Sequence, residues 1–308
     1  MSRYKYILLI IFGVFIFGTA SAQHYYQYSQ YLFNGLSVNP AYAGSLDAFT
    51  GSVFYRNQWL GFEGSPGTQV LSVHTPLKAE YMAVGLLLDN DMLGVTRNTS
   101  IRVSYAYRLI SDKGTLALGL QLGMKQMVSN LQDVKLVDSQ DQAFGDEKVR
   151  GIIPSSGFGI YFYNNKFFAG LSVPEQFTTK SEIGNSNYKA DHSFRNYNYC
   201  LIVGGEFAIN KELSVKPSGL VRYTFASPVQ PEINTQFIYL DQYLAGIGYR
   251  LNDAVLFHCQ YKLNNQFSFG YAYDHSLSQL RLYNYGSHEI MIRYTLDYRV
   301  NVANPRFF

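Results

Sequence analysis

The six histidines are the residues of this chain best suited to acid–base or metal chemistry, and their spacing argues against both. No H-E-x-x-H pattern surrounds any of them, and the chain contains no Cys-x-x-Cys, P-loop or G-x-S-x-G motif. Ser72 and His74 lie two residues apart, which puts a hydroxyl and an imidazole on one face of a strand. Because such a pair arises readily by chance, we expect no catalytic site and no enzyme. The histidines are His24, His74, His192, His258, His275 and His288.

The other candidate ligands are the two cysteines and the carboxylates of an acidic loop that ends at Arg150. The spacing of the carboxylates does not match the EF-hand loop, so we expect a solvated surface loop and no metal or cofactor. Cys200 and Cys259 each fall inside an expected strand and could pair only if their strands were neighbours, a question that the sequence leaves open. The carboxylates of the loop are Asp133, Asp138, Asp141, Asp146 and Glu147.

Charged side chains occur instead at alternate positions of apolar segments, and this pattern defines the elements that hold them. In Thr115–Lys125, four leucines and a methionine at positions 116 to 124 alternate with small or polar residues. A strand places successive side chains on opposite faces, so one face of this segment is apolar and the other is polar. The alternation recurs from Ala48 to Arg299, which is typical of a transmembrane barrel with lipid outside and a polar interior.

We therefore predict an all-β protein, a transmembrane antiparallel outer-membrane β-barrel of about fourteen strands over residues 47–308, with a short periplasmic tail. With the mature amino terminus in the periplasm, every second connection should be a tight turn. Those connections are short, whereas Ser129–Pro154, Val173–Asn196 and His275–Ser287 are long. Pro217 should produce a bulge in the ninth strand. The strands are expected at 47–57, 68–76, 80–89, 98–109, 114–128, 155–164, 166–174, 196–209, 212–225, 232–241, 243–251, 254–263, 266–274 and 286–299.

The inward faces of these strands carry more basic than acidic residues, which allows two interpretations. The charges could favour anions in an open pore. They could instead form a network that fills a closed lumen and pairs in part with the amino-terminal segment, which is the interpretation we favour. The basic residues expected in the lumen are Arg102, Arg108, Lys125, Lys216, Arg222, Lys262, Arg293 and Arg299, and the acidic ones are Asp274, Glu289 and Asp297.

The amino terminus indicates export. Arg3 and Lys5 precede an apolar stretch at residues 7–18, and Ala-Ser-Ala at residues 20–22 forms an A-x-A cleavage site. Residues 1–22 are therefore expected to be a signal peptide that is removed on export to the outer membrane. No later stretch has the unbroken apolar length of a membrane helix.

The composition is consistent with this expectation. The 25 basic and 22 acidic residues give a net charge of +3, and loss of the two basic residues of the signal peptide would leave +1, which does not suggest a nucleic-acid partner. The chain has 27 tyrosines and 22 phenylalanines, and tyrosine suits the aromatic girdles at the two membrane interfaces of a barrel.

Several short motifs resemble those of the PorP/SprF family and occur in the same order, so that the resemblance extends over the whole mature chain. Gly35 stands where proline would be expected, a small departure. The segments that carry the resemblance are Gln30–Asn34, Asn39–Gly44, Arg56–Trp59, Gly61–Gly64, Pro66–Thr68, Ser72–Pro76, Gly286–Ile290 and Asn304–Phe308.

The resemblance implies a non-enzymatic outer-membrane component of the type IX secretion system, which exports proteins that carry a C-terminal sorting domain. Some family members serve gliding motility by enabling export and surface attachment of large adhesins, and others contact the periplasmic ring of the machine. The implied partners are a secreted substrate protein, the ring components and outer-membrane lipid. A barrel of about fourteen strands is too narrow for a folded adhesin, and a separate, larger barrel is understood to be the translocon, so an accessory role is expected.

The leading segment, residues 23–46, is a first candidate for partner binding or for capping the lumen, and it is expected in the periplasm or in the lumen. Asn39, Pro40 and Tyr42 belong to a turn in which proline fixes φ. The aromatic residues just before the turn favour a packed position over a solvated linker.

The segment at residues 56–68 is the second candidate and is expected on the outer surface. Arg56, Asn57, Trp59 and Phe62 could bind a partner there, since Trp and Arg are frequent hot spots of binding. They could equally belong to a loop that folds inward and caps the lumen.

A passive porin or small-solute channel is the alternative function. A continuous open lumen with measurable conductance would favour the channel, whereas a plugged lumen and protein partners would favour the secretion role. An enzyme would need a Ser/His/acid cluster at the outer rim.

Overall fold

The alternating segments form antiparallel strands in the computed structural model of the protein, which describes residues 29, 31–133, 148–176, 178–181, 188–191, 193–225 and 227–296. The strands of the wall are β1 (Phe49–Asn57), β2 (Gly67–Pro76), β3 (Met82–Leu93), β4 (Thr96–Ser111), β5 (Gly114–Asn130), β6 (Lys148–Tyr163), β7 (Phe167–Val173), β10 (Tyr199–Gly205) with β11 (Phe207–Ala208), β12 (Leu213–Thr224), β13 (Ser227–Tyr239), β14 (Tyr243–Arg250), β15 (Ala254–Lys262), β16 (Phe267–Ser276) and β17 (Ser287–Leu296). The connections contain the hairpin of β8 (Thr178–Ser181) and β9 (Tyr188–Asp191), which the alternation does not predict, and the short 3-10 helices η3 (Leu131–Asp133), η5 (Phe194–Asn196) and η6 (Gln279–Leu282).

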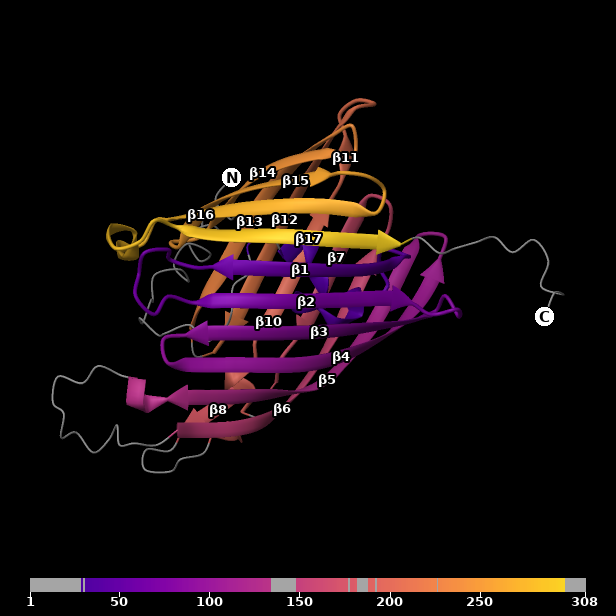
Figure 1. Ribbon diagram of the computed structural model, residues 1–308. Helices are drawn as coiled ribbons and strands as arrows, with labels where there is room; N and C mark the ends of the chain where they lie inside the picture. Colours follow the sequence, from indigo (N-terminus) through magenta and orange to yellow (C-terminus); the bar gives the residue numbers. More distant parts are fainter. Residues whose placement is uncertain are drawn as a thin grey trace, which may run out of the picture.

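The wall closes into a barrel. The strands pair in chain order, and β1 also pairs with β17. β10 pairs with both β7 and β12, which closes the sheet on itself. Because β10 and β11 together form one strand of the wall, the result is a closed antiparallel barrel of 14 strands, which confirms the prediction (Figure 1). In the described part of the chain, no helix is long and apolar enough to cross a lipid bilayer.

Two prolines explain where the expected starts of two strands are wrong. β6 and β13 begin at Lys148 and Ser227, several residues earlier than expected, and continue through Pro154 and Pro231. Proline removes one ladder donor, so a strand tolerates it where one side has no partner. β7 pairs with β6 only from Phe158 onward, and β14 pairs with β13 only from Glu232 onward, so each proline is paired with a neighbouring strand on one side only.

The bulge expected at Pro217 is not observed, because β12 keeps a constant register with β13 through this residue. The irregularity lies in the neighbouring strand instead. β10 ends at Gly205 and β11 begins at Phe207, opposite the stretch of β12 that contains Pro217. Because Pro217 has no N–H to donate, the strand opposite it is interrupted between β10 and β11, whereas β12 itself stays continuous.

The two faces of the wall separate as the alternation predicts. In β4, the side chains of Ile101, Val103 and Tyr105 are exposed to the outside of the barrel, whereas Arg102 and Ser104 between them are buried inside it. The outward positions of β5 from 116 to 124 are all exposed and apolar, as expected for the side of a barrel that faces lipid.

The two ends of the barrel differ. At one end, the connections at residues 77–81, 112–113, 164–166, 209–212, 240–242 and 263–266 are all short, and we call this the turn end. At the other, the loop end, lie the longer connections at 58–66, 131–147, 174–198 and 277–286. The loop end is on the left in Figure 1.

Residues 31–48, the lumen segment, lie inside the barrel behind β1 and β17 (Figure 1). The segment contains η1 (Tyr31–Phe33), α2 (Gly35–Val38) and η2 (Pro40–Tyr42). Its buried apolar side chains form two clusters with inward residues of the wall. The wall has small residues where the segment approaches it: a Cβ atom on Gly119 of β5 would lie 2.2 Å from the backbone nitrogen of Ala41. The sequence of the wall is thus fitted to a filled interior. The small inward residues are Ala83, Gly85, Ala106, Ala117 and Gly119.

Some expectations concern residues outside the described ranges. They are the signal peptide and the first residues of the leading segment, most of the acidic loop, and the carboxyl-terminal tail. Individual residues in this group are His24, His192, Asp297 and Arg299.

Candidate functional site

Arg56 lies in the lumen and not on the outer surface, where its segment was expected to be. Its neighbour Tyr55 faces outward, so the alternation of β1 turns Arg56 inward, where it is 3% exposed. Its Nη2 atom is 2.8 Å from Oδ2 of Asp274, and Nη1 is 3.3 Å from Oε2 of Glu289. Both carboxylates are buried beside the guanidinium. Their negative charges therefore offset the cost of removing the positive charge of Arg56 from water.

Arg250 extends this network across the loop-end half of the lumen. Its Nε atom is 2.7 Å from Oε2 of Glu232, and Nη1 is 3.1 Å from Oδ2 of Asp253 and 3.6 Å from Oδ2 of Asp274. Asp274 is therefore shared by Arg250 and Arg56. Sequence reasoning missed Arg250 and Glu232, although the outward-facing Tyr249 gave the signal that Arg250 faces inward.

Ser29, just ahead of the lumen segment, joins the same network. Its Oγ donates to Oδ2 of Asp274 at 2.5 Å, and its backbone N–H donates to Oε2 of Glu289 at 3.1 Å. Arg56 in turn donates to Oγ of Ser29 at 2.7 Å. The chain that enters β1 from the turn end is thus also held near the loop end, so it extends along most of the lumen.

Other lumen charges are held in pairs. Arg102 pairs with Asp89, and Lys125 pairs with Glu175. Oγ of Ser100 donates a second bond to Asp89 at 2.6 Å. Charges paired in this way are suited to a filled interior and do not present free basic groups to passing anions.

Two arginines bind the lumen segment directly. Arg108 pairs with Asp47 and donates from Nε to the hydroxyl of Tyr163 at 3.0 Å. Arg293 donates to the backbone carbonyl of Phe33, and its guanidinium carbon lies 5.6 Å from the centre of the Phe33 ring. These contacts fix the segment at both its ends.

Four of the expected lumen charges form no ion pair with another described residue. Two of them are Arg293, which donates to the Phe33 carbonyl, and Lys216, whose Nζ atom lies 5.7 Å from the centre of the Phe168 ring. The other two are Arg222 and Lys262. Arg222 is buried inside β12, and Lys262 is half-buried in the last position of β15 at the turn end. Cys200 faces the lumen and Cys259 faces outward on strands that are not neighbours, so both thiols are free.

Asn39 and its neighbours fix the turn of the lumen segment to the wall. Oδ1 of Asn39 accepts from the N–H of Ala41 at 2.9 Å and caps η2, in which Pro40 is the first residue. The Nδ2 atom of Asn39 donates to the carbonyls of Ile160 at 3.0 Å and Leu171 at 3.4 Å in the wall. One amide therefore holds the turn internally and attaches it to two strands.

We expect Asn39→Asp to lower the free energy of unfolding in lipid vesicles by about 2–3 kcal/mol, because a carboxylate cannot donate and would face two carbonyls while buried. Asn210→Asp is the matched control, since Asn210 only accepts, from the N–H groups of Glu212 and Leu213 at 2.8 Å. Urea midpoints of the two variants and the wild type measure the effect. Equal midpoints for all three proteins would contradict it.

Tyr42 packs between His74 and Tyr161, with ring centroids 5.5 and 5.6 Å apart. His74 is buried, and its Nδ1 atom accepts from the backbone N–H of Gly44 at 3.3 Å. The imidazole next to Ser72 is thus engaged by the lumen segment. Tyr42 is likewise inside the barrel, where a protein partner does not reach it.

Asn57, Trp59 and Phe62 remain at the loop end. Trp59 has a φ of 54°, and its backbone N–H donates to Oγ of Ser287 at 3.1 Å. The backbones of Leu60, Tyr285 and Gly286 then exchange two hydrogen bonds of 2.8 Å. These bonds join the β1–β2 loop to the β16–β17 loop.

The joined loops carry a set of exposed apolar side chains that we call the outer patch. Gly61 has a φ of 91°, and a Cβ atom there would lie 2.7 Å from the ring of Tyr285, so only glycine allows this approach. Phe62 was a candidate from the sequence, whereas the β16–β17 loop was missed even though residues 280–285 contain two leucines and two tyrosines. The outer patch consists of Leu60 (40% exposed), Phe62 (45%), Leu282 (74%), Tyr283 (68%) and Tyr285 (77%).

Comparisons with known proteins agree on a membrane barrel. A family model described as "Type IX secretion system membrane protein PorP/SprF" matches residues 20–294. No curated protein sequence matches the chain.

The chain is similar to several solved structures. The monoaromatic hydrocarbon channel CymD is 13% identical, with a TM-score of 0.51 over 85% of this chain and 92% of that one. A FadL homologue of Pseudomonas aeruginosa is 11% identical (TM-score 0.48, 85% and 93% covered). Omp33 of Acinetobacter baumannii is 7% identical (TM-score 0.47, 81% and 99% covered). At this identity the likeness to CymD concerns the fold alone, and the barrel fold together with the family match supports a location in the outer membrane.

Proposed function

The chain belongs to the PorP/SprF family of type IX secretion system membrane proteins, and on that premise we propose that it is a non-enzymatic accessory barrel that docks a secreted protein at its loop end. Its substrate would be a protein with a C-terminal sorting domain, of the type that gliding-motility adhesins represent, and the barrel would support its export or surface attachment. Export of the barrel itself would use residues 1–22 as a cleaved signal peptide.

The outer patch is the observation that carries this proposal. Loops at the outer end of a bacterial barrel face the surroundings of the cell, and the outer patch holds large apolar side chains there in a fixed arrangement. Exposed aromatic groups are costly in water and are the residue types that dominate protein–protein binding. The backbone N–H of Trp59 holds the loop beneath them through its hydrogen bond to Oγ of Ser287.

The filled lumen favours docking over passive transport. A porin needs a continuous aqueous path, whereas the lumen segment and the Arg56 and Arg250 networks occupy the interior here. The short turns at the opposite end would face the periplasm, where the ring components of the machine are the proposed second partner.

Truncation of the outer patch tests the docking role. A tagged wild-type protein and a Phe62→Ser/Tyr285→Ser variant would be purified from mildly crosslinked native outer membranes. We expect the variant to recover about thirtyfold less of the secreted protein with a C-terminal sorting domain, since loss of a hot spot costs about 2 kcal/mol or more. Mass spectrometry identifies and quantifies the partner.

Phe225→Ser is the matched control, because Phe225 is a 60% exposed aromatic residue at the loop end between β12 and β13. It should leave recovery unchanged. Equal recovery by the double variant and the wild type, or recovery of the barrel alone in every case, would refute docking at the outer patch.

A further inference from the structure

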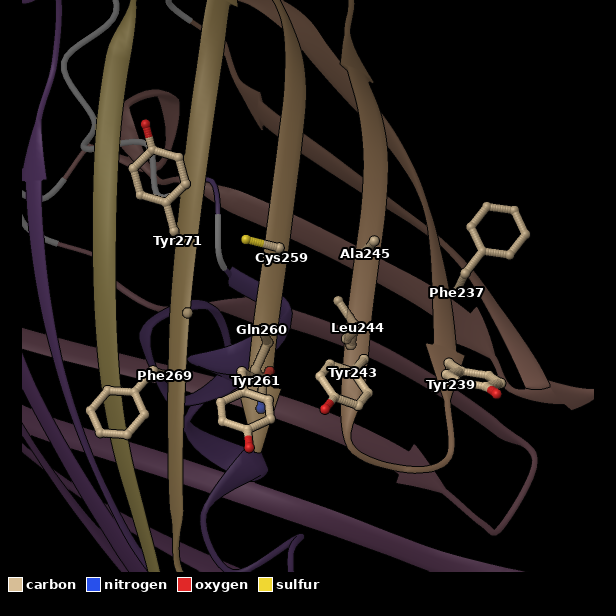
Figure 2. A pocket seen from close by; sticks show the side chains of 11 residues that line it. Phe237, Tyr239, Tyr243, Leu244, Ala245, Cys259, Gln260, Tyr261, Phe269 and Tyr271 are labelled. Atoms are coloured by element: carbon tan, nitrogen blue, oxygen red, sulfur yellow. The ribbon is translucent and has the colours of Figure 1, made fainter. Parts of the chain in front are cut away.

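The outward surface of β13–β16 contains a depression close to the turn end (Figure 2). Its volume is about 590 Å³. It lies on the outward, apolar face of the wall, away from the lumen and from the outer patch. Figure 2 shows Ala245 and Cys259 on neighbouring strands between the large side chains of Phe237 and Tyr271.

The strand register explains the depression. Phe237, Ala245, Cys259 and Tyr271 are consecutive partners across β13, β14, β15 and β16, and their side chains all face outward. The two small residues are direct neighbours, so the surface is lowered over the width of two strands, about 10 Å.

A row of tyrosines borders the depression on the side of the turn end. Tyr239, Tyr243 and Tyr261 are consecutive partners in the next outward row, and the rings of Tyr243 and Tyr261 stack with centroids 5.2 Å apart. This row is one outward position closer to the turn end than Ala245 and Cys259. Tyr239 is the last residue of β13, Tyr243 is the first of β14, and Tyr261 is the last but one of β15. Tyrosines at this level belong to the interfacial girdle, where phenol hydroxyls meet the polar parts of lipids.

We propose that the depression is a binding site for a glycerophospholipid of the leaflet at the turn end, with one acyl chain over Ala245 and Cys259. Its ester and phosphate region lies against the hydroxyls of Tyr239, Tyr243 and Tyr261. The apolar band of a barrel is surrounded by hydrocarbon, so the occupant that fits is a flexible chain that ends in hydrogen-bond acceptors at the girdle. An unbranched acyl chain fills a lowered strip between aromatic walls, and the phenols supply donors at its polar end.

Filling the depression tests this site. Wild-type protein and the Ala245→Phe variant would be extracted in a mild detergent, and native mass spectrometry would measure the bound phospholipid. We expect wild type to retain a phospholipid that Ala245→Phe loses. Ala169→Phe is the matched control, because Ala169 is also exposed on the outer face, two residues from the strand end at a short turn, and should retain the lipid.

Equal lipid retention by Ala245→Phe and wild type would overturn the proposal. So would a dimeric wild type that becomes monomeric in Ala245→Phe, since the occupant would then be a second copy of the chain.

A measurement on unaltered protein removes any dependence on folding of the variant. In lipid nanodiscs with a phospholipid whose acyl chain carries a photoreactive diazirine, adducts should concentrate on β14 and β15, and an even spread over all outward strands would contradict the site.

Discussion

Removal of the lumen segment is expected to raise the single-channel conductance of the barrel in planar bilayers by about tenfold or more, because a cleared lumen of this strand number is wide enough for water and ions. The wild-type protein should show low conductance, since the lumen segment and its ion pairs occupy the interior. The variant lacks residues 29–46, which removes Ser29 and all of the lumen segment except its last two residues. Asp47 is kept so that its pair with Arg108 at the turn end remains.

A single substitution should move conductance in the same direction. Gly119→Val places a branched side chain where even a Cβ atom would lie 2.2 Å from Ala41, so the turn of the lumen segment must move away from β5. Gly219→Val is the control, because Gly219 faces outward and has no neighbour closer than 3.8 Å to an added Cβ atom. A wild type that conducts as well as the deletion variant would show that the segment does not seal the barrel and would favour the passive channel.

Arg56→Met is expected to lower the free energy of unfolding by about 3–5 kcal/mol, because it leaves the buried carboxylates of Asp274 and Glu289 with a lost partner. Urea unfolding in lipid vesicles, followed by the heat-dependent shift in gel mobility, measures the change. Arg97→Met is the control, since Arg97 is exposed on the outer face of β4 and should change stability little.

The same site offers a test of the cause. Replacing both carboxylates as well, in Arg56→Met/Asp274→Asn/Glu289→Gln, should recover a large part of the loss. The two buried carboxylates that lost Arg56 are then neutral amides, and Arg250 keeps its pairs with Glu232 and Asp253. No recovery in the triple variant would mean that packing of the long arginine side chain, and not charge compensation, provides the stability.

The wall of the barrel could be predicted because the alternation of apolar and polar residues within each strand identifies its outward and inward faces. Alternation within Thr115–Lys125 depends only on the neighbours along one strand, and closure then follows because lipid offers no hydrogen-bond partner to an unpaired strand edge. The limits at Pro154 and Pro231 could not be predicted, because the tolerance for proline depends on where the adjacent strand ends.

The candidate site was less predictable because it depends on which strands meet. The sequence leaves open whether the segment of Arg56 and Trp59 binds a partner outside or folds inward, and only the position of Arg56 in β1 shows that its side chain faces the lumen. The pairing of Arg250 with Glu232 requires the register of β13 against β14, which no local pattern supplies. The aromatic residues ahead of β1 indicated a packed segment, but the space for it comes from small residues on separate strands, such as Ala106 and Gly119.

The ion pairs of Arg56 can form only after the last two strands of the barrel have been made. Arg56 lies in the first strand, and its partners Asp274 and Glu289 lie 218 and 233 residues later, on the last two strands. During synthesis and insertion, the guanidinium therefore has no compensating charge until the carboxyl-terminal strands are in place. A prematurely terminated chain would hold an uncompensated charge at the seam between its ends, so the same contacts that stabilise the finished barrel disfavour an incomplete one.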